Sequence, residues 1–222
     1  MKNFLLAASV ATLSFTAAAN AASVVVDFEF GSEGDVVTGD TVDGVTLDSN
    51  ERLVLFQSNC NNAASSPLPN CSGNDGDLAT GPDFDTDPQG LVLIIDTTDS
   101  GDPDTDPNDS AGGGEFIFDF TENVFLETIT LLDIDNNPSI TSVSFDFLFG
   151  DGTSSTGNAA TGFAPNLLNP AFPNDNSLTE FTFNLANVDT FTVDFNGSGA
   201  VAALAFTTPD GGTPPVPLPA GA

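Results

Sequence analysis

Phenylalanine recurs at every second position in several short segments, and this period-two pattern constrains the fold more than any other feature. In residues 115–120, EFIFDF, and 143–149, VSFDFLF, the phenylalanines fall on one side of an extended chain. Residues 181–185, FTFNL, and 191–195, FTVDF, repeat the pattern. Successive side chains of a β-strand point to opposite faces, so this spacing predicts strands with one buried face.

Other apolar segments predict further strands, several of them buried on both faces: 24–30, 44–47, 53–57, 91–96, 124–134 and 201–206. Clusters of Gly, Pro, Asn and Asp separate the segments, which is typical of turns. We therefore expect an all-β fold, an antiparallel β-sandwich of jelly-roll type, spanning residues 22–208. The 20 phenylalanines would fill the space between its two sheets, because the chain contains no Trp or Tyr. The stretches 58–89, 97–114 and 150–178 are expected to be long loops.

The two ends of the chain indicate export. Residues 1–21 begin with Lys2, continue with a short apolar run and end in the small-residue pattern Ala19-Asn20-Ala21, which is typical of a cleaved signal peptide. The apolar run is too short to span a bilayer. Residues 209–222 form a Pro- and Gly-rich linker that contains VPLPA. We expect a secreted or cell-surface protein.

The charge of the chain excludes some partners. The sequence has 32 acidic and two basic residues, and cleavage after Ala21 removes Lys2, which leaves 1 − 32, or −31. Nucleic acids and anionic membrane surfaces would be repelled. Cations, basic surfaces and neutral glycans remain as partners, and adaptation to salty surroundings is an additional explanation of the charge.

Cys60 and Cys71 are the only cysteines. An even pair in an exported chain predicts a disulfide, which would contribute about 3 kcal/mol by closing a short loop. A reactive thiol is not expected, because no His is present to lower its pKa.

Calcium is the metal that the acidic loops favour. Calcium binds six to eight hard oxygen ligands, and carboxylates two residues apart on a turning backbone can converge on one ion. The predicted ligands are drawn from two clusters: Asp75 and Asp77, and Asp102, Asp104, Asp106 and Asp109. Asp83, Asp85 and Asp87 have the same spacing, and Asp133 with Asp135 lies at a strand end. The alternative is that all of these are solvated turn residues.

Several chemistries are excluded or disfavoured. An EF-hand is excluded because Asp109 stands where the loop glycine belongs and no helices flank the loop. The absence of His removes Ser-His-Asp catalysis and the usual transition-metal sites. A glycosidase could use two carboxylates, but no pair differs from its neighbours in the sequence. We therefore assign no catalytic residues.

The order of motifs resembles a family of exported bacterial proteins. VTGDTVDGVTLDS, GDL at residues 76–78, NDSAGGGEFIFDF, LLDID, GSGAVAALAF and the final VPLPAGA carry this resemblance, which covers almost the whole mature chain. The family carries the PEP-CTERM sorting signal, more narrowly the VPLPA type. The resemblance implies a jelly-roll domain similar to galactose-binding modules, processing by an exosortase and a destination at the cell surface or in an exopolysaccharide matrix. Sorting signals of this type continue into an apolar helix and an Arg-rich end, which do not follow Ala222, so we expect a truncated sequence or a secreted protein without an anchor.

These observations lead to three functional hypotheses. The first is an exported, non-enzymatic surface or extracellular-matrix protein that is stabilised by calcium and contacts polysaccharide. The second is an extracellular glycan hydrolase that uses paired carboxylates. The third is a structural matrix protein that self-associates through calcium bridges between acidic faces.

Overall fold

The structure is a computed structural model that describes residues 21–60, 68–97, 101–134, 143–158, 161–170 and 175–209. The described residues form 11 strands and three short 3-10 helices, which confirms the all-β prediction. Within these ranges no helix has the length and apolar character needed to cross a membrane. Apart from Ala21, the predicted signal peptide lies outside the described residues, and so do the VPLPA motif and Asp135.

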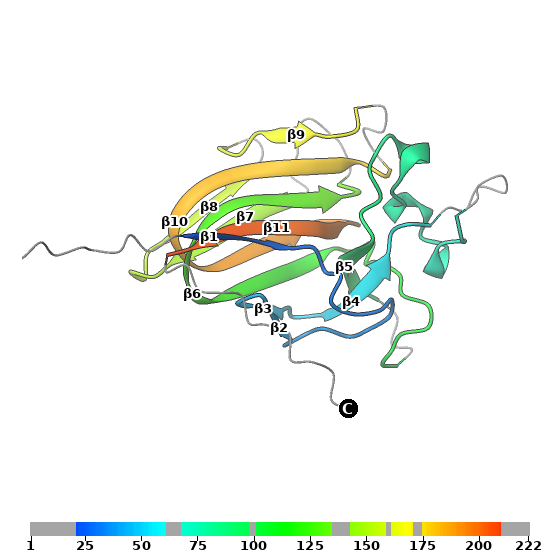
Figure 1. Cartoon of the computed structure of the whole chain (residues 1–222), viewed down its shortest axis with the longest axis horizontal. Coiled ribbons are helices and arrows are strands. Elements are labelled where there is room, and N and C mark those ends of the chain that lie inside the picture. The colour runs from blue at the N-terminus through cyan, green and yellow to red at the C-terminus, as the bar shows by residue number, and fades with distance from the viewer. Residues whose placement is uncertain are drawn as a thin grey trace, which may run out of the picture.

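The strands pair into one antiparallel sheet in the order β4-β5-β11-β6-β10-β7-β8 (Figure 1). Off this path, β1 pairs with β11, β3 pairs with β2 and β6, and β9 pairs with β10. The elements are β1 (Ala22–Val26), β2 (Thr41–Val42), β3 (Val45–Asp48), β4 (Arg52–Gln57), η1 (Ser72–Asn74), η2 (Gly76–Leu78), η3 (Pro82–Phe84), β5 (Leu91–Asp96), β6 (Gly114–Leu132), β7 (Val143–Phe149), β8 (Ser154–Asn158), β9 (Pro165–Leu167), β10 (Leu178–Phe195) and β11 (Ala200–Thr208).

Two long strands, β6 and β10, give the sheet its layered shape. The first part of β6 pairs with the last part of β10, and its last part pairs with the start of β10. The register of this pair shifts three times between Thr182 and Thr190, and such bulges bend and twist a strand. Figure 1 shows both strands curving round one end of the molecule, so each contributes to both layers. The sheet therefore folds over itself as a sandwich, and its jelly-roll connectivity stays a prediction.

Phenylalanine fills the space between the layers, as the period-two pattern predicts. Phe191 of β10 stacks on Phe147 of β7, with ring centroids 5.2 Å apart, and lies 5.9 Å from Phe118 of β6. Phe116 meets Phe195 edge to face at 5.3 Å. Phenylalanines from several parts of the chain thus share one core, which explains how a chain without Trp or Tyr packs a large sandwich.

A second, smaller core lies on the opposite face of β4 and β5. Residues of these strands alternate between the two cores, so both strands are buried on both faces, as their continuous apolar sequences predict. Leu78 of η2 and the two cysteines cover this second core from outside. The polar loop that contains the 3-10 helices is thereby anchored to the sheet.

Three details differ from the sequence prediction. Segment 115–120 and residues 124–132 of the second segment belong to one strand, β6, and 181–185 and 191–195 belong to β10, because the chain bends between them without a reversing turn. The expected loop 150–178 contains two short strands, β8 and β9, whose largely exposed residues lack an apolar alternation. Strand β1 ends at Val26, ahead of Phe28, which is buried with φ of 62°.

Candidate functional site

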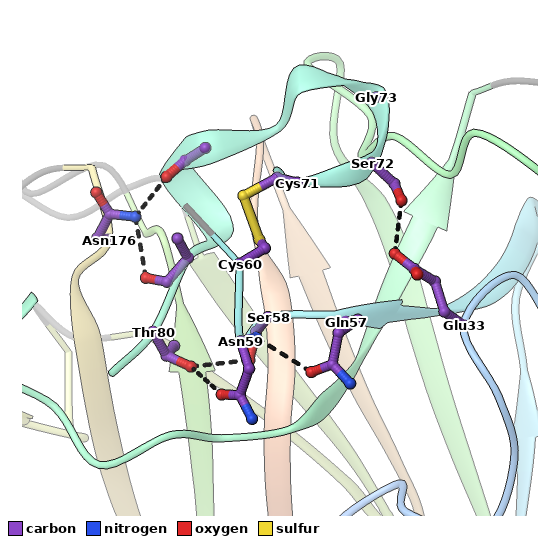
Figure 2. The surroundings of a disulfide bond; sticks show 12 residues. Glu33, Gln57, Ser58, Asn59, Cys60, Cys71, Ser72, Gly73, Thr80 and Asn176 are labelled. Carbon is purple, nitrogen blue, oxygen red and sulfur yellow. Dashed lines mark hydrogen bonds between the residues drawn. A yellow bond between two sulfur atoms is a disulfide. The ribbon is translucent and has the colours of Figure 1, made fainter. Parts of the chain in front are cut away.

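A disulfide-anchored segment brings the first predicted calcium ligands to the sheet. We call residues 71–78 the strap. Cys71 forms the predicted disulfide with Cys60, which follows β4 (Figure 2). The next residue, Ser72, donates a hydrogen bond of 2.6 Å to Glu33. Gly73, at φ of 60°, packs so closely that a Cβ atom there would lie 2.8 Å from the carbonyl oxygen of Pro107. The strap is therefore fixed against the loop that contains the second cluster of predicted ligands.

Asn176 holds the other end of the strap. Its side-chain amide donates to the carbonyl oxygens of Gly76 at 2.7 Å and Ala79 at 3.0 Å (Figure 2). Its backbone N–H donates to the carbonyl oxygen of Asp77 at 2.8 Å. These bonds satisfy the polar backbone of η2 and fix the direction in which the strap enters the second core.

Four acidic side chains meet where the strap contacts the ends of β6 and β11. We call Asp75, Asp77, Asp109 and Asp133 the aspartate cluster. The carboxyl groups of Asp75 and Asp77 are hydrogen-bonded to each other. The backbone N–H of Asp109 donates to Asp75 Oδ2 at 3.1 Å. Asp75, Asp109 and Asp133 are all buried, with exposed fractions of 8% or less.

Ser198 links the remaining two members of the cluster. Its Oγ lies 2.8 Å from Asp109 Oδ2 and also 2.8 Å from Asp133 Oδ2. The backbone N–H of Gly199 donates to the same Asp109 oxygen at 2.7 Å. A serine hydroxyl has one proton, so it can donate to only one of the two carboxylates at a time. The second contact needs a proton on a carboxyl group or a cation between the oxygens.

The electrostatics of the cluster also require a proton on a carboxyl group or a cation. Burial, the hydrogen bond with Asp77 and the charge of Asp109 together raise the pKa of Asp75 from 3.8 to about 9. Burial also raises the pKa of Asp109, although the hydrogen bonds from Ser198 and Gly199 lower it. Asp77 Oδ1 is buried and accepts no hydrogen bond from the described residues. At neutral pH the cluster therefore retains a proton on Asp75.

The only arginine of the chain lies beside this cluster. The guanidinium group of Arg52 contacts Asp96 at 3.3 Å and Asp104 at 3.2 Å, and both carboxylates are fully buried. It also donates to the carbonyl oxygen of Gly101. Arg52 thus neutralises part of the acidic loop 101–109 and holds the loop against β4 and β5.

The structure separates the six predicted calcium ligands into two groups. Asp75, Asp77 and Asp109 lie together in the aspartate cluster, which also includes Asp133. Asp104 is bound to Arg52, the exposed Asp106 accepts a bond of 2.8 Å from the Gly73 N–H, and Asp102 is exposed. Asp83, Asp85 and Asp87 are exposed on a different loop.

The aspartate cluster is not arranged as a finished metal site. Among the described residues, no group of three or more His, Cys, Asp or Glu side chains has the geometry to hold a metal ion. The carboxyl groups instead meet in pairs: Asp75 lies against Asp77, and Asp109 and Asp133 both contact Ser198 Oγ. Loss of the Asp75 proton and rotation of the side chains would be needed for all of them to face one ion.

Sequence reasoning missed the partners that organise these acids. Ser198 and Gly199 lie in GSG between two strands, a sequence that also fits an ordinary turn. Arg52 could have been found, because the only arginine of a chain with 32 acidic residues is expected to pair with some of them.

Comparison with known proteins adds no assignment: no family model matches the chain, and neither the curated proteins nor the solved structures contain a detectable match.

Proposed function

We propose that the protein is an exported, non-enzymatic component of the cell surface or extracellular matrix, stabilised by a calcium ion at the aspartate cluster. The observation that supports the calcium proposal is the shortage of donors within the cluster. Among the described residues, the carboxyl groups of Asp75 and Asp109 accept from one hydroxyl and two backbone N–H groups, and the buried Asp77 Oδ1 accepts from none. A bound cation would replace the proton on Asp75 and supply the missing positive charge.

The donor set of the cluster fits calcium better than other ions. Its side-chain groups are carboxylates and a hydroxyl, and such hard oxygens suit calcium, whereas softer metals favour His and Cys. Asp75, Asp77 and Asp109 would hold the ion, with Asp133 completing the set. The ion would connect the strap to the ends of β6 and β11, and so would stabilise the second core.

The proposed location rests on separate observations. A disulfide between Cys60 and Cys71 is stable in oxidising compartments, which supports an extracellular protein. The expected signal peptide and the resemblance to PEP-CTERM proteins support export, sorting by an exosortase and contact with polysaccharide. A hydrolase remains the alternative, since a raised carboxyl pKa also suits a general acid, but Asp75 and Asp109 are buried among structural hydrogen bonds.

A calcium titration of the full chain tests this proposal. We expect saturable binding by calorimetry and a higher melting midpoint in calcium than in EGTA. At a free calcium concentration of 100 times the dissociation constant, the ion should add about 2.7 kcal/mol to the free energy of unfolding. Binding should also release protons, so the measured enthalpy should change with the ionisation enthalpy of the buffer. Asp77→Asn should weaken binding, whereas Asp83→Asn, which alters an exposed aspartate outside the cluster, should not.

Two results would contradict the proposal. Equal melting midpoints in calcium and EGTA at low ionic strength would exclude a stabilising ion. Calcium-dependent growth of light scattering, equal in Asp77→Asn and wild type and without saturable binding, would instead favour the self-associating matrix protein.

A further inference from the structure

A cavity of about 590 Å³ opens to solvent on the side of the molecule that carries η3 and β9. Its walls come from η3 and the loop after it, from the residue after β9 and from the facing ends of β6 and β10. This cavity is separate from the aspartate cluster, since none of the four clustered aspartates lines it.

The lining of the cavity divides by depth into a neutral floor and an acidic rim. Leu178 is buried, and Thr130 and Gln89 are half-buried, so the deeper part contains apolar, hydroxyl and amide groups. Asp85 and Asp87 are exposed at the edge. The exposed Leu168 and Pro82 add apolar surface beside the carboxylates.

A buried amide fixes the walls of the cavity relative to one another. The side chain of Asn169 donates to the carbonyl oxygen of Phe84 at 3.1 Å and accepts the N–H of Leu178 at 2.7 Å. The hydroxyl of Thr86 accepts the N–H of Gly81 at 2.7 Å, which closes the turn that contains η3. The cavity is therefore held open by hydrogen bonds within the protein, as expected of a preformed binding site.

We propose that this cavity binds a neutral sugar residue of a polysaccharide. A sugar ring has hydroxyl groups that can donate to Asp85 and Asp87, and C–H faces that can lie against Leu168 and Leu178. The amide of Gln89 can both donate to and accept from such hydroxyls. The cavity would be the site at which the protein contacts polysaccharide, so this proposal rests on that part of the proposed function. It does not depend on calcium binding.

The arrangement of charge disfavours other ligands. An anionic ligand would meet two carboxylates and no base in the lining. An ammonium group would be attracted to Asp85 and Asp87, but it would leave the apolar, hydroxyl and amide groups of the lining without a partner.

The test is saturation-transfer NMR and calorimetry of the full chain with glucose, galactose and mannose and their β1→4-linked disaccharides. We expect at least one of these probes to bind, and Gln89→Ala and Asp85→Asn each to weaken its binding about tenfold through loss of a hydrogen bond. Asp83→Asn is the matched control, because Asp83 is exposed on the same loop but does not line the cavity, and it should bind as wild type.

The outcomes separate this proposal from the calcium proposal. Each variant is also titrated with calcium, and Gln89→Ala should keep the calcium response of wild type. The proposal would be overturned if none of the sugars bound, or if Gln89→Ala and Asp85→Asn bound the sugars as tightly as wild type. It would also be overturned if the diamine putrescine bound and the sugars did not. A melting midpoint equal to that of wild type shows that each variant is folded.

Discussion

At the scale of single residues, Arg52 has a larger role than its place at the start of β4 suggests. Its guanidinium group lies between two buried carboxylates that come from β5 and from the acidic loop. Like charges this close would repel each other without a base or a cation. One arginine therefore decides whether the loop packs against the sheet.

We expect Arg52→Met to destabilise the fold by about 2–4 kcal/mol, because it keeps much of the hydrocarbon stem and removes the charge between Asp96 and Asp104. Arg52→Lys should be intermediate, since an ammonium group cannot match the fork of a guanidinium group. Urea unfolding measures both. If Arg52→Met had the same urea midpoint as wild type, the ion pairs of Arg52 with Asp96 and Asp104 would contribute nothing to stability.

Asp75 makes stability depend on pH. Its folded-state pKa of about 9 lies above the ordinary value of 3.8, so between these values the folded protein keeps a proton that the unfolded chain has lost. The contribution of Asp75 to stability is therefore fully present below pH 3.8 and is lost as pH rises toward 9.

Asp75→Asn should remove this dependence, because asparagine has the shape of the protonated acid and can donate to Asp77. Without calcium, we expect the variant to be more stable than wild type by at least about 1 kcal/mol near pH 8, with a smaller difference near pH 5. Urea unfolding in EGTA at both pH values checks this. A variant less stable than wild type near pH 8 would contradict a protonated Asp75.

Part of the site could be predicted from sequence at this scale. The sequence predicts Asp75, Asp77 and Asp109 as calcium ligands, which stays a prediction, and the fold brings all three together. The same spacing could not separate them from Asp102 and Asp106, because exposure depends on how the loop packs. Only the three-dimensional contacts of Ser198 and Gly73 distinguish the two groups.

At the scale of elements, the disulfide controls the strap. Cys60→Ala with Cys71→Ala should lower stability by about 3 kcal/mol, because the unfolded chain is no longer closed into a loop. The change should also weaken the calcium response, since the strap carries Asp75 and Asp77. Thermal melting in calcium and in EGTA measures both effects. A reducing agent should reproduce them in wild type and have no effect on the double variant.

The strands show how far the sequence pattern reaches. Phenylalanine at every second position predicted the strands and their buried faces, because a half-buried strand leaves a direct pattern in the sequence. The pattern could not show that two predicted strands form one continuous β6, since a bend at a bulge needs no turn residues. The edge strand β8 has the polar sequence SSTGN, which lacks the apolar alternation that predicts a strand. Its strand conformation is seen only from its pairing with β7.

At the scale of the whole molecule, the net charge predicts sensitivity to salt. With 32 acidic residues, repulsion across the surface should destabilise the folded state at low ionic strength. Raising NaCl from about 0.01 M to about 0.15 M shortens the screening length from about 30 Å to about 8 Å and should raise the melting midpoint. Calcium should raise the melting midpoint more than magnesium does at the same ionic strength, because screening is equal for the two ions. Identical curves for the two ions would assign all stabilisation to screening.

The bent course of β6 and β10 has a mechanical consequence. Each of these strands runs as one uninterrupted backbone from one layer of the sandwich into the other. Neither layer can then peel away while the other stays intact, because the hydrogen bonds of both are formed by the same two strands. Pulling or heating should therefore open the molecule in a single all-or-none step.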